Sequence, residues 1–135
     1  STEDHGELRK DFPGGWKGDK VNVFDDIGLS SLQMETKSFV KNLLNWRKSS
    51  KAVAHGKLIH YPVTNGIYVY FRTYQKDKLM VIMNNKENKE MLNLDIYRET
   101  FENKNYGVDI ISGKTYNLLE ELIVNPKTAL ILDLK

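Results

Sequence analysis

The hydrophobic positions after residue 57 come in short runs separated by turn residues, which is typical of a β-rich domain. In the clearest run, residues 67–74, apolar Ile67, Val69 and Phe71 alternate with more polar positions, as in a strand that buries one face. The preceding dipeptide Asn65-Gly66 is a strong turn signal. We predict strands over residues 58–63, 67–74, 79–83, 91–96, 108–111, 115–118, 122–124 and 129–134.

Three stretches of this region support more specific predictions. Residues 79–83 are apolar at every position, so we expect a central strand that is covered on both faces. Lys76-Asp77 is expected to form the hairpin connection before it, and residues 97–105 a short helical turn within a loop. The fold class that follows is mainly β: an antiparallel β-sandwich of seven or eight strands, preceded by one α-helix and an irregular N-terminal loop.

Between about residues 30 and 50 the spacing changes to that of an amphipathic helix. Ser30 and Gln33 have the spacing of a capping box at its start, and Gly56 is a plausible stop after a last, looser turn. We expect the apolar stripe to face a core, and specifically to pack on the sandwich. The stripe consists of Leu32, Phe39, Val40, Leu43, Leu44 and Trp46.

The first 28 residues have neither period and contain five of the nine glycines, which predicts a long irregular loop. Its aromatic side chains need a surface to pack on. We therefore divide the chain into residues 1–56, a loop and helix that belong to a larger unit, and residues 57–135, the β-sandwich.

The composition argues against several classes of protein and several kinds of functional site. The chain has 135 residues, no cysteine and a formal net charge of +2, with acidic and basic residues mixed along its length. These values argue against a disulfide scaffold, a zinc ribbon, a thiol nucleophile and a nucleic-acid-binding protein, and no apolar run approaches a membrane span. The three histidines are scattered, and the carboxylates of the first 19 residues lack calcium-loop spacing, so we predict neither a metal nor a cofactor. The absence of cysteine fits the cytoplasm and a disulfide-free periplasmic protein equally.

Two groups of aromatic residues are candidate sugar-binding residues, because an aromatic ring can stack on the apolar face of a pyranose. Phe12 and Trp16 flank the Pro-Gly-Gly turn of the N-terminal loop, although rings in such a position commonly pack on neighbouring loops. Tyr68, Tyr70 and Tyr74 share one face of the strand at 67–74, where tyrosine is also an ordinary strand residue.

The segment Arg9-Lys10-Asp11-Phe12-Pro13-Gly14-Gly15-Trp16 resembles the loop after the eighth barrel strand in glycoside hydrolase family 13, the α-amylase family. The resemblance is closest to its cyclomaltodextrinase, neopullulanase and maltogenic amylase branch. Residues 39–48 are similar to the eighth barrel helix, and residues 55–58 to the junction with the C-terminal domain. Asp109-Ile110-Ile111-Ser112-Gly113 fits the C-terminal β-sandwich.

The resemblance implies a C-terminal fragment, namely the last loop and last helix of a truncated (β/α)8 barrel (1–56) followed by the C-terminal domain (57–135). The parent would hydrolyse or transglycosylate α-1,4-glucans or maltooligosaccharides with retention, using carboxylates on earlier barrel strands, so we expect no catalytic residue here. Arg9, Asp11, Phe12 and Trp16 would belong to a loop at the substrate cleft. Arg9 and Asp11 are more simply a pair that braces the loop.

The partner that the resemblance implies is the barrel of the same polypeptide, which the sandwich would stabilise. Two alternatives remain open at this point: an α-glucan-binding module that uses Tyr68, Tyr70 and Tyr74, or an unrelated β-sandwich interaction domain. Without its barrel the chain would expose apolar side chains of the helix and loop, which favours a homodimer through one of them.

Overall fold

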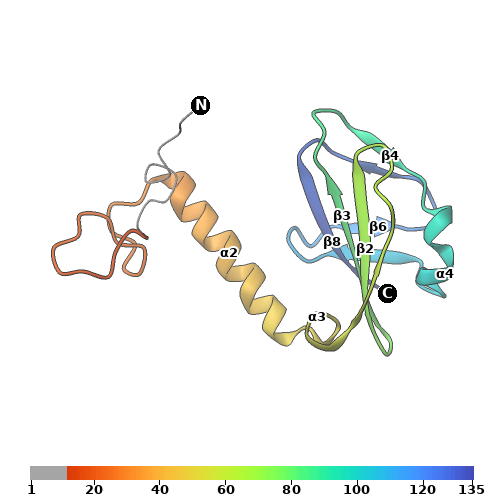
Figure 1. The fold of residues 1–135 in the computed structure, drawn as a ribbon, viewed down its shortest axis with the longest axis horizontal. Helices are drawn as coiled ribbons and strands as arrows, with labels where there is room; N and C mark the ends of the chain where they lie inside the picture. The colour runs from red at the N-terminus through yellow and green to blue at the C-terminus, as the bar shows by residue number, and fades with distance from the viewer. Residues whose placement is uncertain (1–11) are drawn as a thin grey trace. The chain divides into compact units, whose positions relative to one another are not determined.

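A computed structural model describes residues 12–135. The chain divides into two compact units between Asn45 and Trp46, and each is described by itself. The second unit holds all eight strands (Figure 1). Over residues 12–135, no helix combines the length and apolar character that a membrane crossing requires.

The strands of the second unit form two antiparallel sheets. The larger sheet has the order β1-β2-β3-β8-β5-β6, and the smaller sheet pairs β4 with β7. The mainly β, antiparallel prediction is therefore confirmed. The strands are β1 (Lys57–His60), β2 (Ile67–Tyr74), β3 (Asp77–Asn84), β4 (Glu90–Leu92), β5 (Tyr106–Asp109), β6 (Thr115–Asn117), β7 (Leu122–Val124) and β8 (Thr128–Leu134).

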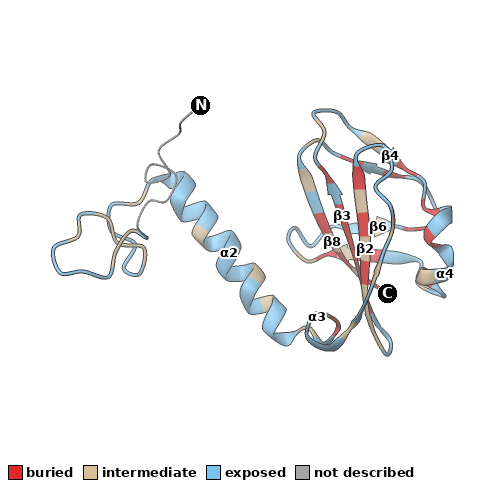
Figure 2. Cartoon of the chain, in the orientation of Figure 1, coloured by how far each residue is buried: buried red, intermediate tan, exposed pale blue. Residues whose placement is uncertain are grey.

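The core is built from the side chains that alternate to one face of the large sheet. On β2 these are Ile67, Val69 and Phe71, each at most 3% exposed, and Figure 2 shows buried positions alternating with intermediate ones along β2. Strand β3 lies between β2 and β8, which confirms the prediction of a central strand. Both of its faces are buried over residues 78–82, because Leu79 and Val81 on the outer face are covered as well.

A short helix covers part of that outer face. Helix α3 (Lys51–His55) packs on β2 and β3, and its Ala52 is buried. The Arg72 guanidinium of β2 donates to the carbonyl oxygens of Ala52 (3.3 Å) and Val53 (2.8 Å). A cation at this end of a helix also interacts favourably with the helix dipole. Gly56 caps α3, as the sequence predicts.

The loop after β4 carries part of the core. It contains a 3-10 turn, η1 (Asp95–Tyr97), followed by α4 (Arg98–Phe101), which confirms the predicted helical turn. Tyr97 and Phe101 are almost fully buried, and both rings lie within 6.0 Å of the Phe71 ring, centroid to centroid. Lys78 Nζ donates to the Thr100 carbonyl at 2.9 Å and so ties α4 to β3.

The turns between the strands form at or next to the residues that favour them. Asn65 and Gly66 have φ of 50° and 75°, the left-handed conformation that this dipeptide adopts readily, and the predicted turn is confirmed. The next hairpin turns at Gln75 and Lys76, because Asp77 already pairs with Tyr74, so the prediction at Lys76-Asp77 is wrong by one residue. The predicted strand at 91–96 ends early, since Asp95–Tyr97 forms η1.

Helix α2 (Ser31–Ser49) begins with the predicted capping box. The Gln33 amide donates to Ser30 Oγ at 3.3 Å, and the Ser30 amide donates to Gln33 Oε1 at 2.8 Å. No residue of α2 is buried among residues 12–135, and the prediction that its stripe packs on the sandwich stays a prediction, because the two units are described separately. The predicted helical period is confirmed. The exposed apolar residues of α2 are Leu32, Met34, Phe39, Val40 and Leu44.

Candidate functional site

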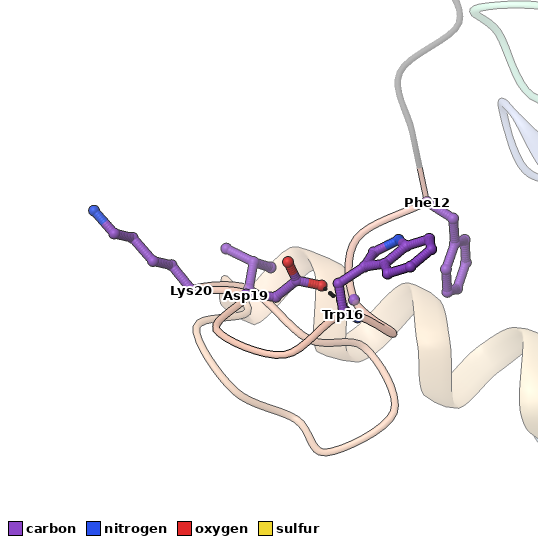
Figure 3. Close-up of a pocket in the computed structure, with 6 residues that line it drawn as sticks. Phe12, Trp16, Asp19 and Lys20 are labelled. Atoms are coloured by element: carbon purple, nitrogen blue, oxygen red, sulfur yellow. Dashed lines mark hydrogen bonds between the residues drawn. The ribbon is translucent and has the colours of Figure 1, made fainter.

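The first unit contains an open pocket of about 600 Å³ in the loop before α2 (Figure 3). Two of its lining residues, Phe12 and Trp16, are residues that the sequence singled out. Three more, Asp19, Lys20 and Val21, were not predicted. The full lining is Phe12, Gly14, Trp16, Asp19, Lys20 and Val21.

Both aromatic rings of the pocket are exposed. Trp16 is 83% exposed and Phe12 is 65% exposed, although the Phe12 ring also lies 5.7 Å from the Phe24 ring, centroid to centroid. Figure 3 shows the two rings on one side of the loop and the Lys20 side chain extending away. Exposed rings next to polar side chains match what a carbohydrate needs, namely an apolar stacking surface with hydrogen-bonding groups at its edge.

Asp19 shapes this pocket. Its Oδ2 accepts a hydrogen bond from the Trp16 amide at 3.0 Å, and its own amide donates to the Trp16 carbonyl at 3.3 Å. The carboxylate thus closes the turn that presents the indole. The sequence signal for this role was the position of Asp19 three residues after Trp16 and directly after Gly18, a spacing typical of turns.

The close approach of the loop backbone explains why glycine stands at Gly14 of the Pro-Gly-Gly segment. Gly14 has φ of 109°, and a Cβ there would lie 2.5 Å from Asn22 Oδ1. Only glycine allows this approach, which lets the Val23 amide donate to the Pro13 carbonyl at 3.0 Å. The predicted loop residues Arg9 and Asp11 lie outside the described residues.

The second candidate group is divided in the structure. The Tyr68 and Tyr70 rings lie 5.7 Å apart at 38°, whereas the Tyr74 ring packs on His55 at the same distance. Arg72, between them, is engaged by α3. All three tyrosines are half-buried, so they do not form one open stacking surface.

The carboxylates of the sandwich have structural roles. Asp109, the one buried carboxylate among residues 12–135, accepts hydrogen bonds from the amides of Ile131 (3.1 Å) and Ser112 (3.0 Å). The Ser112 hydroxyl donates to it as well, at 2.6 Å. The described part of the chain shows no group of three or more metal-ligating side chains.

Two tyrosines have shifted acidities. Burial raises the pKa of Tyr97, with a smaller contribution from the neighbouring Tyr61. Burial also raises the pKa of Tyr116, and the negative charge of Asp109 adds to the shift. Both hydroxyls therefore stay protonated near neutral pH, as expected of groups that pack rather than transfer protons.

Solved structures show the same fold in larger proteins. AmyP in complex with maltose is 17% identical with a TM-score of 0.70, and the match covers 84% of this chain and 23% of AmyP. An Anoxybacillus α-amylase is 20% identical with a TM-score of 0.67, covering 90% of this chain and 26% of the enzyme. Trehalulose synthase MutB from Pseudomonas mesoacidophila is 19% identical with a TM-score of 0.62, covering 85% of this chain and 20% of the synthase. The chain thus spans about a quarter or less of each.

The family assignment rests on the sequence of the sandwich. The model of the family described as cyclo-malto-dextrinase C-terminal domain matches residues 58–133, more than half of the chain. The match confirms the resemblance to the C-terminal part of an α-amylase-family enzyme and does not favour an unrelated interaction domain. This chain belongs to the cyclo-malto-dextrinase C-terminal domain family.

Proposed function

We propose that residues 57–135 are the non-catalytic C-terminal domain of an α-amylase-family glycosidase that acts on α-1,4-glucans with retention. The observation that carries the proposal is the family match over residues 58–133. The buried carboxylate described among residues 12–135, Asp109, supports a non-catalytic role, because its two oxygens accept hydrogen bonds from Ser112 and from the Ile131 amide of β8. A retaining glycosidase needs two carboxylates about 5–5.5 Å apart around the scissile bond, and these would lie on the barrel.

Residues 1–56 fit the last loop and last helix of that barrel. The exposed stripe of α2 supports this assignment, because an amphipathic helix of a barrel buries its apolar side against neighbouring elements. The loop before it would then lie at the barrel face where substrates bind. Exposed Phe12 and Trp16 would form part of the cleft, together with Arg9 and Asp11, and would contact a maltooligosaccharide by stacking.

The proposal is tested on the gene and on the longer protein. The region that encodes the residues before Ser1 is expected to specify a (β/α)8 barrel with the paired carboxylates. The longer protein should cleave maltoheptaose, and removal of residues 57–135 should lower its melting temperature and soluble yield without changing the products. Starch cleavage by the 135-residue chain alone, or an upstream region without a barrel, would contradict the proposal.

A homodimer of the chain follows from the same exposed surface. Several apolar residues of α2 are more than 40% exposed, and contiguous patches of this kind favour association. We expect the chain to dimerise through α2 or the loop, and Phe39→Glu to weaken the dimer. Light scattering coupled to size exclusion measures this directly. A monodisperse monomer at high concentration would contradict the dimer but not the enzyme assignment.

A further inference from the structure

One lysine of α2 makes two contacts with the loop that carries the pocket. Lys37 Nζ donates to the Val23 carbonyl at 2.5 Å and to Asp26 Oδ1 at 2.6 Å. The lysine side chain is only 27% exposed, whereas the Asp26 side chain is 60% exposed. The bond to the carbonyl is partly buried, so Lys37 does more than form a solvent-screened surface pair.

These contacts connect to the aromatic residues through the backbone. Val23 is held at both of its amide groups, because its carbonyl accepts from Lys37 and its N–H donates to the Pro13 carbonyl at 3.0 Å. Pro13 directly follows Phe12. The Phe24 ring, next to Val23, lies 5.7 Å from the Phe12 ring. Two hydrogen bonds and one aromatic contact thus lead from α2 to the pocket.

An anchor on α2 matters because the other hydrogen bonds described for this loop, such as those between Trp16 and Asp19 and from Phe24 to Asn22, lie within the loop itself. Between residues 12 and 28 the structure has one isolated bridge, Asn22 with Ile27, and four glycines at positive φ. Glycine-rich backbone loses much conformational entropy when it is fixed. If that ordering happened only when a ligand binds, it would reduce the affinity, whereas a loop ordered beforehand avoids the loss.

We propose that Lys37 is a positioning residue: it orders the loop of residues 12–28 on α2, so that Phe12 and Trp16 are held ready to stack on an α-glucan. Lys37 acts through Val23 and Asp26 and does not contact the sugar. The identity of the ligand as an α-glucan rests on the proposed function, whereas the ordering of the loop by Lys37 does not. This distinction allows the two to be tested separately.

The experiment follows Trp16 in the 135-residue chain. The chain has two tryptophans, so Trp46→Phe leaves Trp16 as the single indole reporter. Without sugar, time-resolved anisotropy is expected to show more rapid Trp16 motion in Lys37→Met, which loses both contacts. The change should be smaller in Asp26→Asn, which keeps the bond to Val23, and absent in Lys37→Arg, which keeps charge and donors. Lys41→Met, an exposed lysine on the same helix, is the matched control.

The same variants are then titrated with maltoheptaose. Lys37→Met should weaken binding about fivefold, and Lys37→Arg should restore it to within about twofold, while circular dichroism stays unchanged. Unchanged Trp16 motion in Lys37→Met, or an equal effect in Lys41→Met, would overturn the proposal. If Trp16→Ala binds the sugar as tightly as the parent chain, the cleft role of the loop fails. The anisotropy measurement still decides the role of Lys37 in that case.

Discussion

Strand β3 and helix α2 both carry strong apolar patterns, but only β3 buries them. Met80 and Ile82 of β3 are 0% exposed, whereas Leu32 and Phe39 of α2 are 72% and 46% exposed. Met80 and Ile82 belong to one hydrophobic cluster with buried residues of β2, β8 and the loop between β4 and β5. The comparison separates a domain that satisfies its own hydrophobic pattern from a helix whose pattern needs another surface.

The difference has a consequence for stability. The sandwich removes its large apolar side chains from water, at roughly 25 cal/mol for each Å² of buried apolar area. Helix α2 has 19 residues and no buried side chain, so it depends on local capping and on its own backbone hydrogen bonds. We therefore expect substitutions in the two regions to differ sharply in effect, even where the same residue type is changed.

The largest expected effect is at Phe71. Phe71→Ala removes a ring that contacts Tyr61, Tyr97 and Phe101, and should cost about 3–5 kcal/mol of unfolding free energy. Phe39→Ala on α2 is the matched control and should change the stability of the sandwich by less than about 0.5 kcal/mol. Urea unfolding followed by circular dichroism measures both. Equal losses of unfolding free energy in Phe71→Ala and Phe39→Ala would contradict the difference between the sandwich and α2.

The next largest loss of unfolding free energy is expected at Asn84, at the end of β3. Its buried amide donates to the carbonyls of Asn88, Val124 and Asn125, and its Oδ1 accepts from the Lys86 amide, so it joins the two sheets. Asn84→Ala should cost about 2–3 kcal/mol, because carbonyls with their donor removed remain poorly solvated. Its neighbour Asn85 is exposed, and Asn85→Ala should unfold at nearly the urea midpoint of the unchanged chain.

A smaller effect is expected at Arg72, which fixes α3 to the sheet. Arg72→Met removes the donors to the Ala52 and Val53 carbonyls and should cost about 1–2 kcal/mol. Hydrogen exchange should accelerate at the amides of α3 but not in β8. An unchanged exchange rate in α3 would show that the helix is held by the packing of Ala52 instead.

The smallest effect is a pH dependence from Tyr97. Burial raises its pKa in the folded chain above the ordinary value of 10.0, so the folded state resists ionisation that the unfolded chain allows. The stabilisation is complete below pH 10 and is lost as the pH rises through the folded pKa. Tyr97→Phe should flatten the alkaline fall in stability, as measured by urea midpoints from pH 8 to 11. An identical fall in both proteins would contradict this assignment.

Local chemistry explains which features the sequence predicted well. The capping box at Ser30 and the Asn65-Gly66 turn depend on neighbouring residues, and the alternation along β2 depends on one buried face. The surface that covers the α2 stripe cannot be identified from the sequence, because amphipathicity shows that a surface is needed and not where it lies. Asp19 was missed as a pocket residue because its role depends on the fold of the turn after Trp16.

Hydrogen exchange across the whole chain tests the central difference most directly. Amides in the middle of β2, β3 and β8 should exchange about a thousandfold or more slowly than unstructured peptides, since they open only with the sandwich. At a dilution where light scattering shows the chain to be monomeric, amides of α2 should exchange within about tenfold of the unstructured rate, because no packing protects them. Protection of α2 equal to that of β3 would contradict the account.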